Sequence, residues 1–157
     1  MLDIISDLWY NQIMKNCLIT LKTISSPVGG EADIIELTSP ARFSVLKNGR
    51  YKIVYSETAL AGYEGAVTEI TCSKETAVVK RKGNAEMRLC LDLKKKHYSI
   101  YKTPFGEFSI GVSARKIETD LTENGGRIHL KYALTFDSNP FTENEIIIDI
   151  KTEEKND

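Results

Sequence analysis

The chain has 157 residues, of which 21 are lysine or arginine and 22 are aspartate or glutamate, so its net charge is -1. This length suits a single domain, and 41% hydrophobic with 27% charged residues is typical of a globular chain rather than a disordered one. The balanced charge disfavours a dedicated binder of nucleic acid or anionic membranes, because such proteins carry a broad basic surface. Three cysteines, an odd number, argue against a disulfide-stapled secreted scaffold.

The residues before Met14 differ in style from the rest of the chain. Apolar residues recur there at helical spacing and predict a short amphipathic helix: Leu2, Ile5, Leu8, Trp9 and Ile13. Three interpretations stay open: a docking or membrane-surface segment, a loosely held terminus, and an upstream extension of the gene. No apolar run approaches the roughly 20 residues that cross a bilayer, and no basic leader is present, so we expect a cytoplasmic chain with reduced cysteines.

Beyond Met14 the sequence alternates with a period of two, which predicts β-strands. Turn signals such as Asn48-Gly49 recur roughly every 8–12 residues, and no internal segment has a helical pattern. The fold class is therefore all-β and mostly antiparallel, and we favour an up-and-down β-barrel because closure removes exposed sheet edges. The expected strands cover residues 17–23, 31–37, 43–46, 51–57, 66–72, 76–82, 86–91, 97–102, 107–116 or beyond, 128–136 and 145–150.

No internal repeat and no linker divides this pattern, so we expect one β-barrel domain over residues 15–151. It follows an N-terminal extension over residues 1–14 and precedes a polar tail over residues 152–157.

Motifs of common enzymes are absent: there is no phosphate-binding loop, dinucleotide fingerprint, nucleophile elbow or zinc-protease motif. Two histidines, His97 and His129, and three scattered cysteines lack the spacing of metal ligands, so we expect no metal, no cofactor and no catalytic residue. A Cys–His pair formed in space stays open, but Cys17 shares its face with Ile19 and Leu21, as a small buried hydrophobe does. We expect His129 to face solvent.

Two basic clusters, over residues 80–82 and 94–97, invite a nucleic-acid interpretation. Tyr98 and Tyr101 beside the second cluster fall on opposite faces of one strand, and lysine runs are usually solvated hairpin tips that protect sheet edges. We therefore expect no nucleic-acid partner.

Polar residues lie on strand faces that are otherwise apolar. Tyr55 and Glu57 share such a face in one expected strand, Thr68 lies on one in the next, and Arg81 in the third. If these faces line a barrel, Glu57 and Arg81 must meet each other or a ligand, because an isolated buried charge is costly. Either they form an ion pair at the barrel mouth, or Arg81 binds an acidic head group while inward apolar residues cover its tail: Ile110, Val112, Leu130 and Leu134.

Several turns and polar positions occur in a recognisable order: Tyr55-Ser56-Glu57, Thr68, Arg81-Lys82-Gly83, Tyr101-Lys102-Thr103-Pro104-Phe105-Gly106, Asn124-Gly125-Gly126-Arg127-Ile128 and Tyr132. In this order the chain resembles, over about residues 15–150, the YwiB-like family, a bacterial domain-of-unknown-function family with a lipocalin-like (calycin) β-barrel. The resemblance implies a small cytosolic barrel of Firmicutes-type bacteria with no assigned enzyme activity. Residues 1–13 have no counterpart, which favours Met14 as the natural start, and the lipocalin Gly-x-Trp signature is absent, so lipocalin ligand chemistry is an analogy of fold only.

The segment from Tyr101 to Gly106 is the most specific part of this resemblance. Pro104 fixes its own φ and biases Thr103 toward an extended conformation, while Gly106 permits a turn. We favour a hairpin turn whose Phe105 plugs the barrel end over a ligand gate, because turns require these residue types anyway.

Three functional hypotheses follow. The first is a non-enzymatic barrel that binds a small amphipathic or acidic molecule through polar contacts from Tyr55, Glu57, Thr68, Arg81, Tyr101 and Tyr132. The second is a protein-interaction module with a side-chain-filled interior and an external working surface. The third, an enzyme that uses Glu57 as a general acid or base with a tyrosine, lacks a visible nucleophile or orienting partner.

Overall fold

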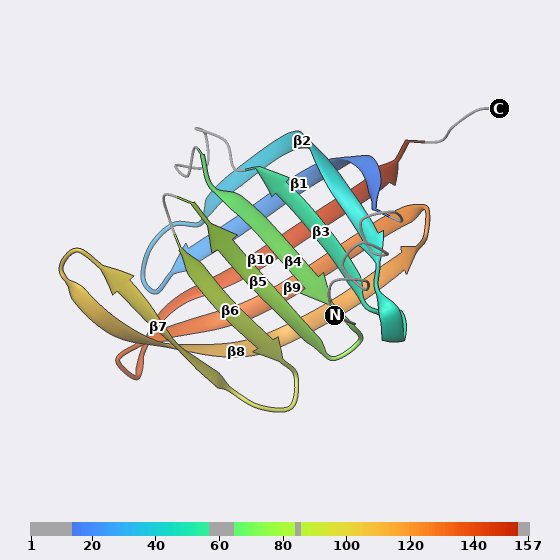
Figure 1. Cartoon of the computed structure of the whole chain (residues 1–157). Coiled ribbons are helices and arrows are strands. Elements are labelled where there is room, and N and C mark those ends of the chain that lie inside the picture. The colour runs from blue at the N-terminus through green and yellow to red at the C-terminus, as the bar shows by residue number, and fades with distance from the viewer. Residues whose placement is uncertain (1–13, 57–64, 84–85, 154–157) are drawn as a thin grey trace, which may run out of the picture.

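The structure, a computed structural model, describes residues 14–56, 65–83 and 86–153. Ten strands in this part of the chain form one sheet in the order β6-β5-β4-β3-β2-β1-β10-β9-β8-β7, with antiparallel neighbours throughout (Figure 1). The strands are β1 (Lys15–Pro27), β2 (Asp33–Val45), β3 (Tyr51–Ser56), β4 (Val67–Cys72), β5 (Thr76–Lys82), β6 (Met87–Asp92), β7 (His97–Thr103), β8 (Gly106–Thr122), β9 (Gly125–Phe136) and β10 (Asn139–Thr152).

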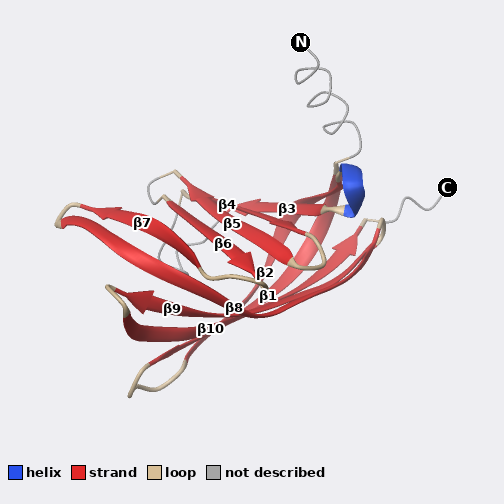
Figure 2. Cartoon of the chain, turned by 90° about the horizontal axis from the view of Figure 1, so that it is seen from below, coloured by secondary structure: helices blue, strands red, loops and turns tan. Residues whose placement is uncertain are grey.

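The sheet curls into a nearly closed barrel, so the predicted all-β, mostly antiparallel barrel is confirmed (Figure 2). Its first and last strands pair with each other, from Cys17 opposite Thr152 to Pro27 opposite Thr142. Closure is incomplete in one place, because β6 and β7 follow each other in the chain and yet are the two edge strands of the sheet. The expectation that closure removes every edge was therefore wrong at this seam. The predicted N-terminal extension lies outside the described residues, apart from Met14.

Because the strands run alternately in opposite directions, the barrel has two distinct ends. We call the end that contains the turns after Val45, Cys72, Asp92 and Thr122 the lower end, and the opposite one the upper end. The upper end therefore contains the end of β5 at Lys82 and the start of β6.

Several strands are longer than the sequence pattern predicts, and in β2 and β10 the extra length includes a proline. Separate strands were expected over residues 31–37 and 43–46, but β2 continues through Ser39 and Pro40, with Pro40 opposite Leu18 of β1. Proline is tolerated there because β3 pairs with β2 only over residues 42–45, so at Pro40 the β2 side away from β1 has no described strand beside it. Likewise β10 begins at Asn139 rather than Glu145, across a register shift between Pro140 and Thr142.

The turn predicted at Asn48-Gly49 is present as a short 3-10 turn, Lys47–Gly49, between β2 and β3. Asn48 and Gly49 adopt φ values of 67° and 69°, a region that these two residue types enter at low cost. The backbone N–H of Leu46 donates to the carbonyl of Arg50 at 2.7 Å and closes the loop.

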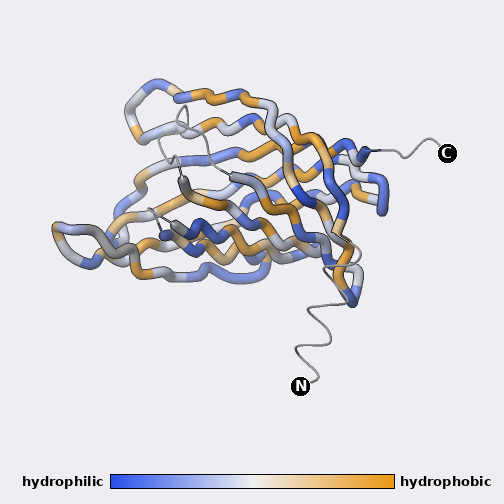
Figure 3. Tube along the Cα trace, turned by 45° about the horizontal axis from the view of Figure 1, so that its top comes forward, coloured by the Kyte–Doolittle hydropathy of each residue, from blue (hydrophilic) through white to orange (hydrophobic). Residues whose placement is uncertain are grey.

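Apolar and polar residues alternate along most strands (Figure 3). The buried residues fall mainly at alternate positions, which form the inner face of the barrel, whereas Tyr98 and Ile100 of β7 are exposed. In the lower half, inner-face residues such as Ile19, Phe43 and Ile53 are fully buried, with exposed fractions of 0–1%. Tyr51 stacks on Phe43 at 5.9 Å between ring centroids, and its hydroxyl donates to the carbonyl of Leu121 at 3.0 Å. This bond joins β3 to β8 and closes the lower end. The largest side chains of this core are Phe43, Ile19, Ile53, Ile70, Leu91, Ile128, Leu130 and Ile148.

Candidate functional site at the upper end of the barrel

Four inner-face residues form one row across neighbouring strands near the upper end. Tyr55 of β3 lies opposite Thr68 of β4, Thr68 opposite Arg81 of β5, and Arg81 opposite Met87 of β6. Tyr55 and Thr68 are buried, with exposed fractions of 7% and 1%, whereas Arg81 and Met87 are half-buried. Three of the residues singled out from the sequence thus come together because the strand register aligns them.

The guanidinium of Arg81 belongs to this inner row. Its Nε is buried, and its Nη1 donates to the Sδ of Met87 across a weak 3.9 Å contact. A cation in such a place is stabilised by acceptors or by water, because desolvation alone is costly. Glu57, the predicted ionic partner, lies outside the described residues, so the Glu57–Arg81 pair stays a prediction, as does the hypothesis of Glu57 as an acid or base.

Tyr132 contributes a second polar position from another part of the wall. It lies on the inner face of β9, is 7% exposed, and sits opposite Ala114 of β8 and Asn144 of β10. The side-chain amide of Asn144 donates to the Oγ1 of Thr142 at 2.7 Å. Asn144 and Met87 were not singled out from the sequence. Asn144 lies just before the strand expected over residues 145–150, and Met87 is the first residue of β6.

The upper inner face of β8 and β9 is apolar and partly accessible. Ile110 and Leu134 are half-buried against the core. Above them the rings of Phe108 and Phe136 pack with centroids 4.9 Å apart, and Phe141 follows at 6.0 Å from Phe136. These inward residues are therefore less buried than those of the core below them.

The most specific predicted segment connects β7 and β8 at this end. Tyr101 lies in β7 opposite Phe108, and its side chain is outside the described part of the structure. The expected plug is wrong: Phe105 is 93% exposed, because the β7–β8 hairpin projects beyond its neighbours and carries its tip into solvent (Figures 1 and 2).

The remaining candidates for chemistry lie away from this row. Burial raises the pKa of Cys17 to about 11 and that of Cys72 to about 12, so both thiols stay protonated, unlike an activated nucleophile. His97 contacts Asp92 at the lower end, with 3.4 Å between Nε2 and Oδ2. His129 was expected to face solvent; its side chain is 18% exposed, and its imidazole pairs with Glu145 of the neighbouring strand. The described residues hold no cluster of potential metal ligands.

The fold and the upper inner row together define a class, that of small antiparallel β-barrels with polar groups on an otherwise apolar interior. Residues 19–148 match the family model described as Domain of unknown function (DUF1934), and the chain belongs to that family. It is 28% identical, over 103 residues, to the uncharacterized beta-barrel protein YwiB of Bacillus subtilis strain 168, a match that covers 66% of this chain and 70% of that protein.

A solved structure gives the same architecture. The crystal structure of the ywiB protein from Bacillus subtilis superposes with a TM-score of 0.67 at 18% identity, covering 87% of this chain and 92% of the other. At this identity the likeness establishes the fold alone. The predicted membership of the YwiB-like family is thus confirmed. Within the described residues no helix is long and apolar enough to cross a membrane.

Proposed function

We propose that this barrel binds a small amphipathic molecule with an anionic head group at its upper end. The head group meets Arg81, with Thr68 and Tyr55 beside it in the same row, and the apolar tail lies along the upper inner face of β8 and β9. The observation that carries this proposal is the position of the Arg81 cation on the inner face. It lies beside the buried Thr68, and it is itself only half-buried.

The contacts to the head group are inferred from the side chains of the row that contains Arg81. A guanidinium offers a planar set of N–H donors that matches a carboxylate or phosphate, and partial burial strengthens such charge-assisted hydrogen bonds. Thr68 and Tyr55 add hydroxyl groups on the two neighbouring strands. Directly opposite residues of paired strands lie about 5 Å apart, so several of these side chains can contact one head group.

The position of the tail is inferred from apolar side chains above the core that are only partly buried. Ile110, Leu134 and Phe136 keep part of their surface exposed although they face inward. Covering apolar surface contributes about 25 cal/mol per Å², so a chain of several methylene groups gains affinity by lying there.

The first experiment is native mass spectrometry of the protein purified from its own host, for which we expect a stoichiometric small-molecule adduct. The second is a titration with 11-(dansylamino)undecanoic acid followed by fluorescence, with dodecanoate and dodecanol as competitors. Dodecanoate should displace the probe far better than dodecanol, because only the acid offers an anion to Arg81.

Variants separate the proposal from a purely structural role of the arginine. Arg81→Leu should weaken probe binding about ten-fold or more while the unfolding midpoint stays near that of the parent, and Arg81→Lys should restore part of the affinity. Arg42→Leu, which removes an exposed arginine from the outer face of β2, is the matched control. Global unfolding of Arg81→Leu would support the structural ion pair instead, and unchanged affinity would reject Arg81 as the head-group contact.

A further inference from the structure

The seam between β6 and β7 is the one break in the described barrel. Each strand pairs on one side only, β6 with β5 and β7 with β8, so both present an edge of the sheet. Unpaired edges attract further strands, and proteins usually shorten, charge or cover them. Here β7 runs for seven residues from His97 to Thr103 without a proline.

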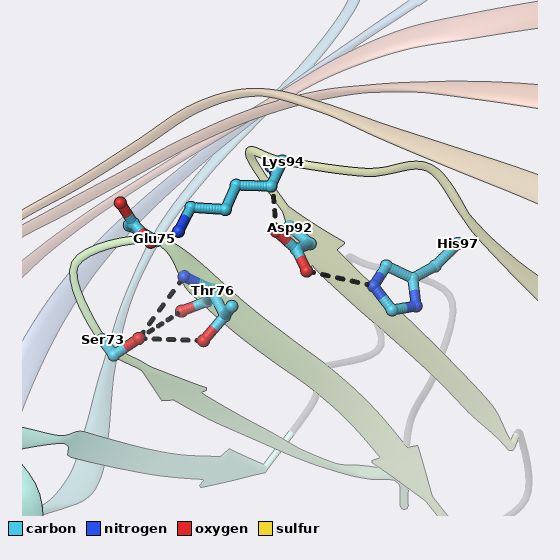
Figure 4. A network of polar contacts seen from close by, with 6 residues as sticks. All are labelled: Ser73, Glu75, Thr76, Asp92, Lys94 and His97. Carbon is cyan, nitrogen blue, oxygen red and sulfur yellow. Dashed lines mark hydrogen bonds and ion pairs between the residues drawn. The ribbon is translucent and has the colours of Figure 1, made fainter.

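The seam is held together at its lower end. Asp92, the last residue of β6, accepts a hydrogen bond from the backbone N–H of Lys94 at 2.9 Å and contacts His97 at the start of β7 (Figure 4). The Nζ of Lys94 also lies 3.1 Å from a carboxylate oxygen of Glu75 in the β4–β5 turn. Above this point β6 and β7 diverge toward the upper end in both views of the barrel (Figures 1 and 2).

The outer face beside β6 is basic. Lys80 of β5 lies directly opposite Arg88 of β6, and Lys82 follows toward the upper end. Like charges on facing positions destabilise a sheet unless an anion approaches them. The neighbouring carboxylate, Glu69, already bonds to Lys52 at 2.5 Å.

The lowered pKa of Glu69 shows that its carboxylate already interacts with nearby cations. Burial opposes ionisation, but the hydrogen bond from Lys52 and the charges of Lys52, Lys80 and Lys82 outweigh burial and lower the pKa. One carboxylate thus faces several cations, and in the described structure no ion pair neutralises Arg88 at the edge itself.

The outer face beside β7 is apolar. Tyr98 and Ile100 are 68% and 67% exposed, large fractions for side chains on an edge strand. The Nζ of Lys96 lies 5.3 Å from the centre of the Tyr98 ring. A strand entering the seam would therefore have cations on one side of its outer face and apolar side chains on the other.

We infer that the seam is a docking site for an extended segment of a partner protein, which adds as a strand beside β6 and carries acidic side chains at alternate positions. Main-chain hydrogen bonds to the free edge would provide affinity, and the acidic side chains would meet Lys80 and Arg88. Single-stranded nucleic acid also suits cations beside a tyrosine, but it cannot pair with the main chain of β6. This inference is independent of the interior ligand.

The test uses the full chain and a fluorescein-labelled octapeptide of alternating glutamate and valine, followed by fluorescence anisotropy. The expected result is saturable binding that weakens as salt is added. The same peptide with alternate amides N-methylated should not bind, because it cannot form the edge hydrogen bonds. Hydrogen exchange of the β6 and β7 amides should slow when the peptide binds, while that of β10 should not change.

Charge-reversal variants test whether Lys80 and Arg88 contact the peptide. Lys80→Glu combined with Arg88→Glu should weaken peptide binding about ten-fold or more and leave binding of the dansyl probe unchanged. Lys151→Glu, an exposed lysine on β10, is the matched control, and Lys80→Gln with Arg88→Gln replaces the double variant if reversal prevents folding. Equal binding of the N-methylated peptide, or binding of an oligothymidine in place of the peptide, would overturn the inference.

Discussion

The lower and upper halves of the barrel interior are built from the same strands and yet differ in how far they are filled. In the lower half, Phe43, Ile53 and Leu91 are 0–1% exposed, and the Tyr51–Leu121 hydrogen bond joins opposite walls. In the upper half, inward residues of β8 and β9 such as Ile110 and Leu134 keep accessible surface. Strand alternation therefore decides which way a side chain points, and contact with the opposite wall decides whether it is buried.

This difference separates residues that hold the fold from residues that are available for binding. The upper half carries the inward arginine, Arg81, which is only half-buried there. The seam follows the same division, since it is fastened at the lower end by Asp92 and His97 and diverges above.

The largest expected effect comes from truncating an aromatic side chain in each half. Phe43→Ala should lower the free energy of unfolding by about 3–5 kcal/mol, because a ring that is 1% exposed and stacked on Tyr51 leaves a cavity in a packed region. Phe108→Ala should cost about 1 kcal/mol, since its ring is only half-buried. Urea unfolding of both variants measures the contrast, and equal losses would show that the upper half is packed as firmly as the lower.

A smaller effect is expected from two glycines at hairpin turns of opposite ends. Gly126, in the lower half, and Gly106, at the upper end, have φ values of 136° and 132°, so alanine is strained at both positions. Only at Gly126 would a Cβ also collide with backbone, 2.0 Å from the carbonyl oxygen of Asp120, whereas at Gly106 nothing lies within 4 Å.

Gly126→Ala should therefore cost about 2–4 kcal/mol and Gly106→Ala about 1–2 kcal/mol in the free energy of unfolding. Chemical denaturation of the two variants under one set of conditions provides the measurement. If Gly106→Ala were the more damaging, the tip of the β7–β8 hairpin would have to be more tightly constrained than the lower end.

The parts of the fold that could be predicted from the sequence are those that depend on interactions between residues close together in the chain. The β5 strand was expected over residues 76–82 and occupies those positions, because its alternation puts Ala77 and Val79 into the core. The turn at Asn48-Gly49 was predictable from its two residues alone. By contrast, β2 continues through Pro40 on a side where no described strand pairs with it, because β3 pairs with β2 only over residues 42–45, and no local pattern records this.

The candidate site was predictable in part for the same reason. Period-two alternation put Tyr55, Thr68 and Arg81 on one face, but their meeting in a row depends on the registers of two hairpins. Asn144 escaped notice because the register shift near Pro140 hides the start of β10. Phe105 was misplaced because hydrophobicity predicts burial only where another part of the chain is close enough to cover the side chain.

The smallest expected effect concerns an ion pair on the outer face, where neither half of the interior is involved. Glu145 of β10 is hydrogen-bonded by His129 and lies 3.9 Å from Lys131. The hydrogen bond from His129, with the nearby positive charges, holds the pKa of Glu145 below its ordinary 4.5 despite partial burial. A carboxylate whose pKa is lower in the folded state contributes stability above its unfolded pKa and loses it as the pH falls toward the folded value.

Wild-type protein should consequently lose more stability between about pH 5 and pH 3 than Glu145→Gln, by less than about 1 kcal/mol, because solvent screens a pair on the barrel surface. Urea unfolding at several pH values measures this difference. The glutamine variant is the informative control, since Glu69 and Asp92 also have lowered pKa values and titrate in both proteins. Equal losses of stability in the two proteins between pH 5 and pH 3 would mean that the ionisation of Glu145 does not stabilise the fold.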